Sequence, residues 1–122
     1  MILFLVRANL SVAMKALIII STYPNKKSVL KTANVVVQKQ LAACVNFTEI
    51  NSVYIWKGKM EKIEEFLAFF KTTAKASSSL KIEIKKLHPY QVPEIAEIKI
   101  NSINKSYFDW LVQSTRWNKS QK

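Results

Sequence analysis

Residues 88–94 contain the side chains most able to do chemistry. The stretch holds the only histidine, His88, followed by Tyr90 and Glu94, together with two of the three prolines. An imidazole, a phenol and a carboxylate can form a polar site for a metal ion or a small ligand. Proline restricts its own backbone and that of the residue before it. The residues by themselves therefore favour a stiff connection between a helix and a strand, with the polar site as the alternative.

Cys44 is the second candidate for chemistry, because it is the only cysteine. With His88 it could act as a nucleophile and base, and both residue types are ligands for copper or zinc. However, Cys44 lies in a run of small apolar residues, where cysteines are usually inert members of a core. One cysteine and one histidine cannot supply four zinc ligands within one chain, so a full metal site would have to form between chains. We predict no catalytic residue and no enzymatic activity.

The composition indicates one globular domain with a basic surface. Of 122 residues, 49% are apolar, and 19 basic against eight acidic side chains give a net charge of +11. All the basic residues except two arginines are lysines, and they occur in both halves of the chain. This distribution is typical of a solvated surface, and lysine reads bases less well than arginine. No specific nucleic-acid partner is expected, and non-specific binding to nucleic acid stays open as an alternative.

Scarce residue types exclude two further classes. A single glycine excludes the glycine-rich loops that hold nucleotide phosphates, because these need several glycines at fixed spacing. A lone cysteine cannot form an internal disulfide, which fits a reducing compartment, so we expect a cytoplasmic protein.

The beginning of the chain is apolar, but it does not predict a membrane anchor. The longest uninterrupted apolar run, residues 1–6, is far shorter than the roughly 20 residues that span a bilayer. No basic segment precedes it, as one would in a signal peptide. No membrane partner is expected, and residues 1–14 are interpreted as an N-terminal extension because Met14 could itself be the start.

Hydrophobic periodicity predicts a strand, a helix and two further strands in the first part of the chain. A β-branched run at 16–22 predicts a strand buried on both faces, and Asn25 can cap the helix that follows. The next strand begins at 43 and resumes at 53–56, with a bend or bulge expected at 49–52. A turn at 57–59, with the only glycine, leads to a strand that ends at 72.

The second part of the chain predicts a helix, a strand and a last short helix. Helical spacing favours a helix over 75–87, although Leu80, Ile82 and Ile84 also alternate as in a strand. Residues 96–100 alternate cleanly, and Asn104 can cap the last helix. The order matches an α+β, ferredoxin-like split βαβ sandwich with an added C-terminal helix. This fold hosts many functions, so it does not decide between them.

The two middle strands form a hairpin ribbon with apolar residues on both faces. Tyr54 and Trp56 lie on one face, with aliphatic residues on the other. One layer of helices can cover only one face, so the other must be covered by something else or bind there. The third strand lacks the glycine of an RNA-recognition motif, so its phenylalanines are assigned to a core or subunit interface. Glu61, Glu64 and Glu65 are interpreted as a solvated ribbon edge.

Four blocks, at 41–46, 52–59, 70–73 and 88–95, resemble in order and spacing the CutA family of divalent-cation tolerance proteins. Residues 107–111 also match. The resemblance covers most of a domain at 15–116, with 117–122 as a tail. It implies a ferredoxin-like subunit that assembles through its ribbons into a homotrimer similar to the PII signalling proteins.

The resemblance also implies a function, tolerance of divalent cations with binding of copper or another divalent metal ion, and no other cofactor. Some members carry a cysteine and a second histidine where this chain has Ser21 and Leu87. His88 and Cys44 remain as candidate metal ligands. A PII-like regulatory trimer, which binds a small molecule or a partner, is the alternative. The predicted cleft between subunits is lined by Tyr54, Trp56, Lys71, His88, Tyr90 and Glu94.

Overall fold

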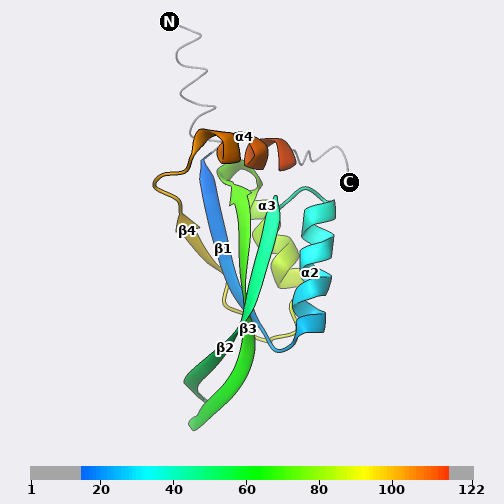
Figure 1. The fold of residues 1–122 in the computed structure, drawn as a ribbon. Helices are drawn as coiled ribbons and strands as arrows, with labels where there is room; N and C mark the ends of the chain where they lie inside the picture. Colours follow the sequence, from blue (N-terminus) through cyan, green and yellow to red (C-terminus); the bar gives the residue numbers. More distant parts are fainter. Residues whose placement is uncertain (1–14, 116–122) are drawn as a thin grey trace, which may run out of the picture.

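Two helices cover one face of a four-stranded antiparallel sheet (Figure 1). The computed structural model describes residues 15–115, so the predicted extension at 1–14 and tail at 117–122 lie outside the described residues. The strands lie in the order β2-β3-β1-β4, which confirms the ferredoxin-like sandwich with its added C-terminal helix. The elements are β1 (Ala16–Tyr23), α2 (Lys26–Gln38), β2 (Cys44–Trp56), β3 (Lys59–Thr73), α3 (Ala74–Leu87), β4 (Ala96–Lys99) and α4 (Lys105–Ser114).

β1 is central because its side chains are apolar on both faces. From Leu17 to Tyr23 every second side chain is buried beneath the helices, and the intervening Ile18 and Ile20 are half-buried on the opposite face. β1 pairs with β3 on one side and with β4 on the other. We call the face that carries Ile18 and Ile20 the open face, since α2 and α3 do not lie on it.

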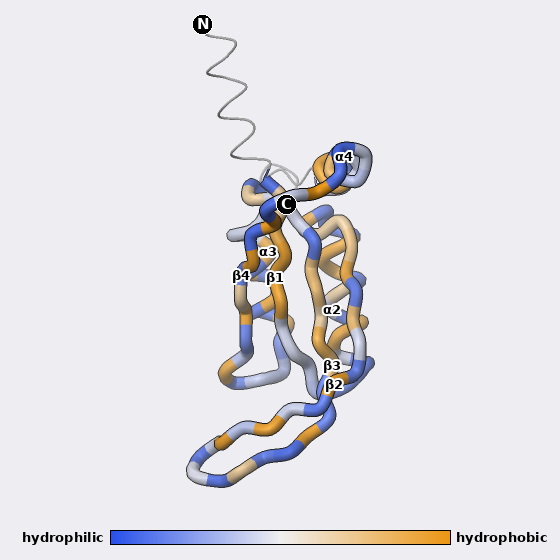
Figure 2. Tube along the Cα trace, turned by 60° about the vertical axis from the view of Figure 1, so that its left-hand side comes forward, coloured by the Kyte–Doolittle hydropathy of each residue, from blue (hydrophilic) through white to orange (hydrophobic). Residues whose placement is uncertain are grey.

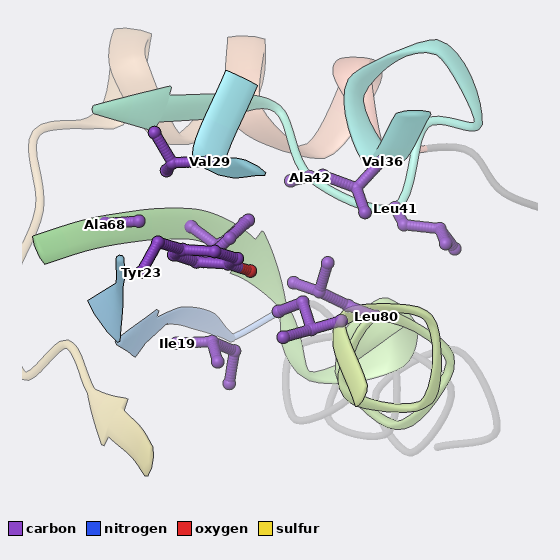
Figure 3. Close-up of a cluster of buried hydrophobic side chains, with 10 residues drawn as sticks. Ile19, Tyr23, Val29, Val36, Leu41, Ala42, Ala68 and Leu80 are labelled. Carbon is purple, nitrogen blue, oxygen red and sulfur yellow. The ribbon is translucent and has the colours of Figure 1, made fainter. Parts of the chain in front are cut away.

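α2 and α3 each pack on the sheet through one row of buried side chains. The side chain of Asn25 accepts a hydrogen bond from the backbone of Ser28 and begins α2, and Thr73 begins α3 in the same way. α3 ends at Leu87, and its C-cap His88 has an extended backbone before Pro89. A strand would place Leu80, Ile82 and Ile84 on one face, but Leu80 and Ile84 are buried whereas Ile82 is 68% exposed. The predicted helix is therefore confirmed. The core between the layers includes Ile19, Tyr23, Val29, Val36, Leu41, Ala42, Ala68 and Leu80 (Figure 3).

β2 and β3 continue past the rest of the sheet as a two-stranded ribbon (Figures 1 and 2). β1 pairs with β3 only as far as Phe66, whereas β2 and β3 stay paired to Trp56 and Lys59. Each residue of 49–52 faces one residue of β3, so the predicted bend or bulge is wrong. The polar residues there reflect a ribbon exposed on both sides and leave the ladder intact. Lys57 and Gly58 turn the chain with positive φ angles of 52° and 80°.

The free part of the ribbon exposes apolar side chains on both faces, as predicted. Val53 and Ile55 are 64% and 70% exposed on one face, and Tyr54 and Trp56 are exposed on the other. Figure 2 shows this stretch as alternating apolar and polar segments that stand apart from the two layers. The described chain therefore leaves a large apolar surface without cover.

Candidate functional site

Three contacts fix His88 where α3 ends. Its ring stacks on Tyr23 with the centroids 4.2 Å apart and an interplanar angle of 21°. Its Nδ1 accepts a hydrogen bond of 3.1 Å from the backbone N–H of Tyr90. Its Nε2 lies 3.1 Å from Oγ of Ser21. Because Nδ1 is an acceptor, the neutral ring carries its proton on Nε2 and donates it to the Ser21 hydroxyl.

The surroundings of His88 favour this neutral form. Burial lowers the pKa of His88, and the backbone of Thr22 and the charge of Glu65 oppose that change only in part. A neutral imidazole has one ring nitrogen that can become a metal ligand. In the tautomer described here the free lone pair is on Nδ1, which accepts from Tyr90, so Nε2 becomes a ligand only if its proton moves to Nδ1 and the contacts with Ser21 and Tyr90 are broken.

Tyr90 forms the second part of the site by covering Glu65. Its hydroxyl donates a hydrogen bond of 2.6 Å to Oε2 of Glu65, whose residue is only 6% exposed. Burial raises the pKa of Tyr90, and the hydrogen bond to Glu65, the charge of Glu65 and the nearby Tyr54 hydroxyl raise it further. The interpretation of Glu65 as a solvated residue is wrong, because the connection after α3 passes the end of β1 and brings Tyr90 onto it (Figure 1).

The ring of Tyr23 stacks on the histidine ring, and its hydroxyl is buried. Among residues 15–115 it is the only buried side-chain nitrogen or oxygen without a hydrogen bond. Burial raises the pKa of this hydroxyl, and the neighbouring Thr32 and Ser21 hydroxyls oppose the rise. Buried polar atoms normally have partners, so this oxygen could still accept one from a ligand or a water molecule.

The six residues predicted to line a cleft do not all meet within one chain. His88 and Tyr90 pack together, with ring centroids 5.2 Å apart, and Tyr54 is near enough to affect Tyr90. Trp56 is at the tip of the ribbon, about 20 Å along the strand from Ile50, the partner of Glu65. The remaining two residues, Lys71 and Glu94, lie away from this group.

Lys71 and Glu94 occupy separate positions. The Nζ atom of Lys71 lies 5.6 Å from the ring centroid of Tyr107, under α4 and at the opposite end of β1 from His88. Glu94 is exposed in the connection after α3. A cleft that contains all six residues would have to include more than one subunit, as the sequence predicts.

Cys44 and His88 are also too far apart to act together in one chain. Cys44 and Ile18 both pair with Lys71, on the open face, whereas Ser21 and His88 lie on the helix side. The positions of Ile18 and Ser21 differ by about 10 Å along β1. This separation excludes a nucleophile and base pair within one subunit.

The donors present in one chain do not fit a resident copper or zinc ion. Around His88 the other polar groups are the hydroxyls of Ser21, Tyr23 and Tyr90 and the bonded carboxylate of Glu65. Copper and zinc prefer further imidazole or thiolate ligands. Across residues 15–115, no three histidine, cysteine or acidic side chains gather as metal ligands.

Ser21, Tyr23 and Glu65 were not among the predicted site residues. Two of them carry a signal in the sequence. Tyr23 alternates in step with the buried Ile19, and Glu65 alternates in step with Leu67 on an otherwise apolar strand. A polar residue in such a register is either buried and bonded or marks the end of the buried face. Only the tertiary contact with Tyr90 decides between the two.

The chain matches the family model of the CutA1 divalent ion tolerance protein over residues 17–114. It belongs to the CutA1 family. The divalent-cation tolerance protein CutA of Thermotoga maritima is 38% identical over 98 residues, which cover 80% of this chain and 97% of the relative. The predicted family is thus confirmed over almost all the described residues.

Solved CutA1 structures have the same fold. The crystal structure of CutA1 from Oryza sativa has a TM-score of 0.82 at 35% identity and covers 88% of this chain and 100% of its own. The structure described as the periplasmic divalent cation tolerance protein CutA from Archaeoglobus fulgidus has a TM-score of 0.80 at 32% identity, with 83% and 98% covered. This chain therefore shares its fold with solved CutA1 structures.

Proposed function

We propose that this CutA1 protein is a homotrimer that acts in tolerance of divalent cations and has no catalytic activity of its own. The observation that carries the proposal is the ribbon, whose tip exposes Val53, Ile55 and Met60 on one face and two aromatic residues on the other. Exposed apolar surface of this extent is typical of an interface between subunits. The half-buried open face adds a second surface that neighbouring subunits would cover.

The binding site belongs to this assembly. A ribbon tip that crosses onto a neighbouring subunit carries Tyr54 and Trp56 with it. The surfaces that bear Lys71, His88 and Glu94 are separate in one chain, and the tip of a second chain can line them together. We assign the cleft to the contact between the ribbon tip of one subunit and the surface of the next. The hydrogen-bonded pair of Tyr90 and Glu65 would form the base of this cleft.

A divalent cation at this cleft would use Nε2 of His88 as one ligand and take its remaining ligands from a neighbouring subunit. The lowered pKa of His88 supports this role, because the ring is neutral at pH 7 and does not repel a cation. The relatives named for divalent-cation tolerance point to the same class of ligand. Because Ser21 offers only a hydroxyl, we expect weak and exchangeable binding of copper or zinc.

A PII-like role, in which the trimer binds a small polar molecule, is the alternative. The observation that favours it is the donor set, which is rich in hydroxyl groups and aromatic faces and poor in soft ligands. Non-specific nucleic-acid binding has less support, because it rests on charge alone.

We assign the protein to the cytoplasm. Its lone cysteine is free, and no helix within residues 15–115 is both long enough and apolar enough to cross a membrane. The relative from Archaeoglobus fulgidus is described as periplasmic and the one from Arabidopsis thaliana as chloroplastic, so relatives differ in location. Cell fractionation separates these locations.

Molar mass in solution tests the assembly. A trimer has a mass of about 42 kDa, three times the 14.0 kDa of one chain. Ile55→Glu places a charge in the proposed interface and should yield monomers. Ile82→Glu is the matched control, since Ile82 is equally exposed but lies on α3. A monomeric wild-type protein, or equal masses for the two variants, would refute the ribbon interface.

Calorimetric titration with Cu(II) and Zn(II) tests the ligand. We expect His88→Ala to abolish binding and Ser21→Cys to strengthen it at least tenfold, because a thiolate is the better copper ligand. Cys44→Ser should bind as the wild type does. Equal affinity of the wild type and His88→Ala would remove His88 from the site, and the absence of binding in both would favour the PII-like alternative.

A further inference from the structure

The positive charge of the described chain is concentrated on one side of the fold. We define the helical layer as α2, its C-cap Lys39, and α3. This layer carries eight lysines and one acidic residue, Glu83, whereas the rest of residues 15–115 carries seven lysines and seven acidic residues. The net charge of the sheet, loops and α4 is thus zero. The sequence distributes its lysines evenly along the chain, and the fold brings half of them into one layer.

Most of these lysines have no neutralising partner. Lys39 pairs with Glu83, and Lys81 pairs with Glu97 of β4. The other six, which are all exposed, make no ion pair within the described part of the chain. They are Lys26, Lys27, Lys31, Lys75, Lys85 and Lys86.

Five of the six gather at one end of the layer. The stacking of Tyr23 on His88 holds the start of α2 next to the end of α3. Lys26 and Lys27 therefore begin α2 at the end of the layer where the lysine pair at 85–86 ends α3, and Lys31 follows just over one turn along α2. The first turn of α2 has no acidic residue, although the positive end of a helix favours one. Like charges repel here, so an anionic surface that docks on this end would relieve the repulsion.

The kind of anion follows from the other exposed residues of the layer. Neither helix contains an arginine or an aromatic residue, which are the side chains that read or stack on nucleic-acid bases. Instead aliphatic side chains stand among the lysines: Ile82 is 68% exposed, Val37 41% and Leu30 37%. Aliphatic groups gain nothing from phosphates in water, but they can enter the headgroup region of a bilayer between bound lysines.

We propose that the helical layer docks on the surface of an anionic lipid bilayer. The layer lies on the other side of the sheet from the open face, so a trimer formed through the open face and ribbon leaves it accessible. Each lysine near an anionic leaflet strengthens binding about fivefold. This proposal departs from the expectation of no membrane partner, because it needs no spanning segment and rests on lysines that are far apart in the sequence and are brought into one layer by the fold.

Vesicle co-sedimentation of the full chain tests the proposal. We expect it to pellet with vesicles that contain 30% phosphatidylglycerol in phosphatidylcholine, to stay in solution with pure phosphatidylcholine, and to be released by 0.5 M NaCl. The variant Lys27→Gln/Lys31→Gln/Lys85→Gln should bind about a hundredfold more weakly. The matched variant Lys15→Gln/Lys99→Gln/Lys105→Gln loses the same charge outside the layer and should bind nearly as the wild type does.

A further variant separates lipid from nucleic acid. Ile82→Ser should weaken vesicle binding about tenfold, because it removes an aliphatic group from the interface and leaves the charge unchanged. Its affinity for a DNA duplex should not change. Equal vesicle binding by the two triple variants would overturn the proposal. Binding to DNA without binding to anionic vesicles would also overturn it, in favour of a nucleic-acid surface.

Discussion

At the scale of residues, the site is a set of polar groups that use one another. His88 accepts a hydrogen bond from the backbone of Tyr90 and contacts Ser21, and the Tyr90 hydroxyl donates to Glu65. Each contact gives a hydrogen-bond partner to a donor or acceptor that would otherwise be buried without one. The positions are therefore coupled, and a change at one should be measurable at the next.

The titration of His88 is the first consequence. Because burial lowers its pKa below the ordinary value of 6.5, the folded protein binds this proton less well than the unfolded chain does. Above pH ~6.5 the His88 side chain is neutral in the folded and the unfolded state and does not lower the free energy of unfolding. That free energy falls as the pH drops from there through the pKa of the folded state. NMR titration of the only imidazole gives the value directly.

Stability measurements complement that titration. Urea unfolding of the wild type should show a loss of stability between pH 7 and 5.5 that is absent from His88→Gln. A folded pKa at or above 6.5 would contradict the buried, neutral ring described above.

Tyr90→Phe tests the second contact. The change leaves the Glu65 carboxylate buried without its donor, and we expect it to lower the free energy of unfolding by about 1–3 kcal/mol. Tyr54→Phe is the control, because Tyr54 is exposed and should change stability by less than about 0.5 kcal/mol. Urea unfolding measures both, and equal effects would show that the contact with Glu65 adds no stability.

At the scale of elements, the ribbon is a long ladder with little burial of its own. Beyond Phe66, β3 pairs only with β2, so the tip depends on that single ladder, its turn and any neighbouring subunit. A two-stranded ribbon alone is marginally stable in water. We therefore expect the tip to be the part of the sheet most sensitive to dissociation of the assembly.

Gly58→Ala probes the turn. Gly58 has a φ angle of 80°, and a Cβ atom added there meets nothing within 4 Å. The cost is backbone strain alone, about 1 kcal/mol per chain. Thermal unfolding should show this as a modest decrease in Tm. A neutral effect would mean that the turn relaxes to another geometry.

At the scale of the whole molecule, two surfaces on opposite sides have different character. The open face and the ribbon carry apolar side chains without cover in one chain, and the helical layer is basic. An assembly that buries the first leaves the second outside. This arrangement allows one chain both to form a trimer and to associate with an anionic surface.

Assembly should make stability depend on protein concentration. If the folded ribbon is stabilised by its neighbours, dilution favours the unfolded monomer, and Tm should fall as the protein is diluted a hundredfold. Differential scanning fluorimetry over that range measures the shift. Ile55→Glu should abolish the dependence. A wild-type Tm that is constant on dilution would contradict coupled folding and assembly.

The sequence alone determined the order of the elements, and it did so through local physics. The β-branched run of β1, the cap at Asn25, the turn at Gly58 and the stop before Pro89 each depend on neighbours in the chain. These signals predict the ferredoxin-like fold and the site region around His88. The expected bend at 49–52 was wrong because polar residues in an exposed ribbon resemble a break in a strand.

The tertiary structure decided which distant groups meet. Nothing local to Glu65 shows that Tyr90 will cover it, and Ser21 faces His88 only because α3 ends beside β1. Lysines spread along the chain became one basic layer for the same reason. Contacts between residues far apart in sequence depend on how the layers pack, and a pattern of nearest neighbours carries no record of that packing.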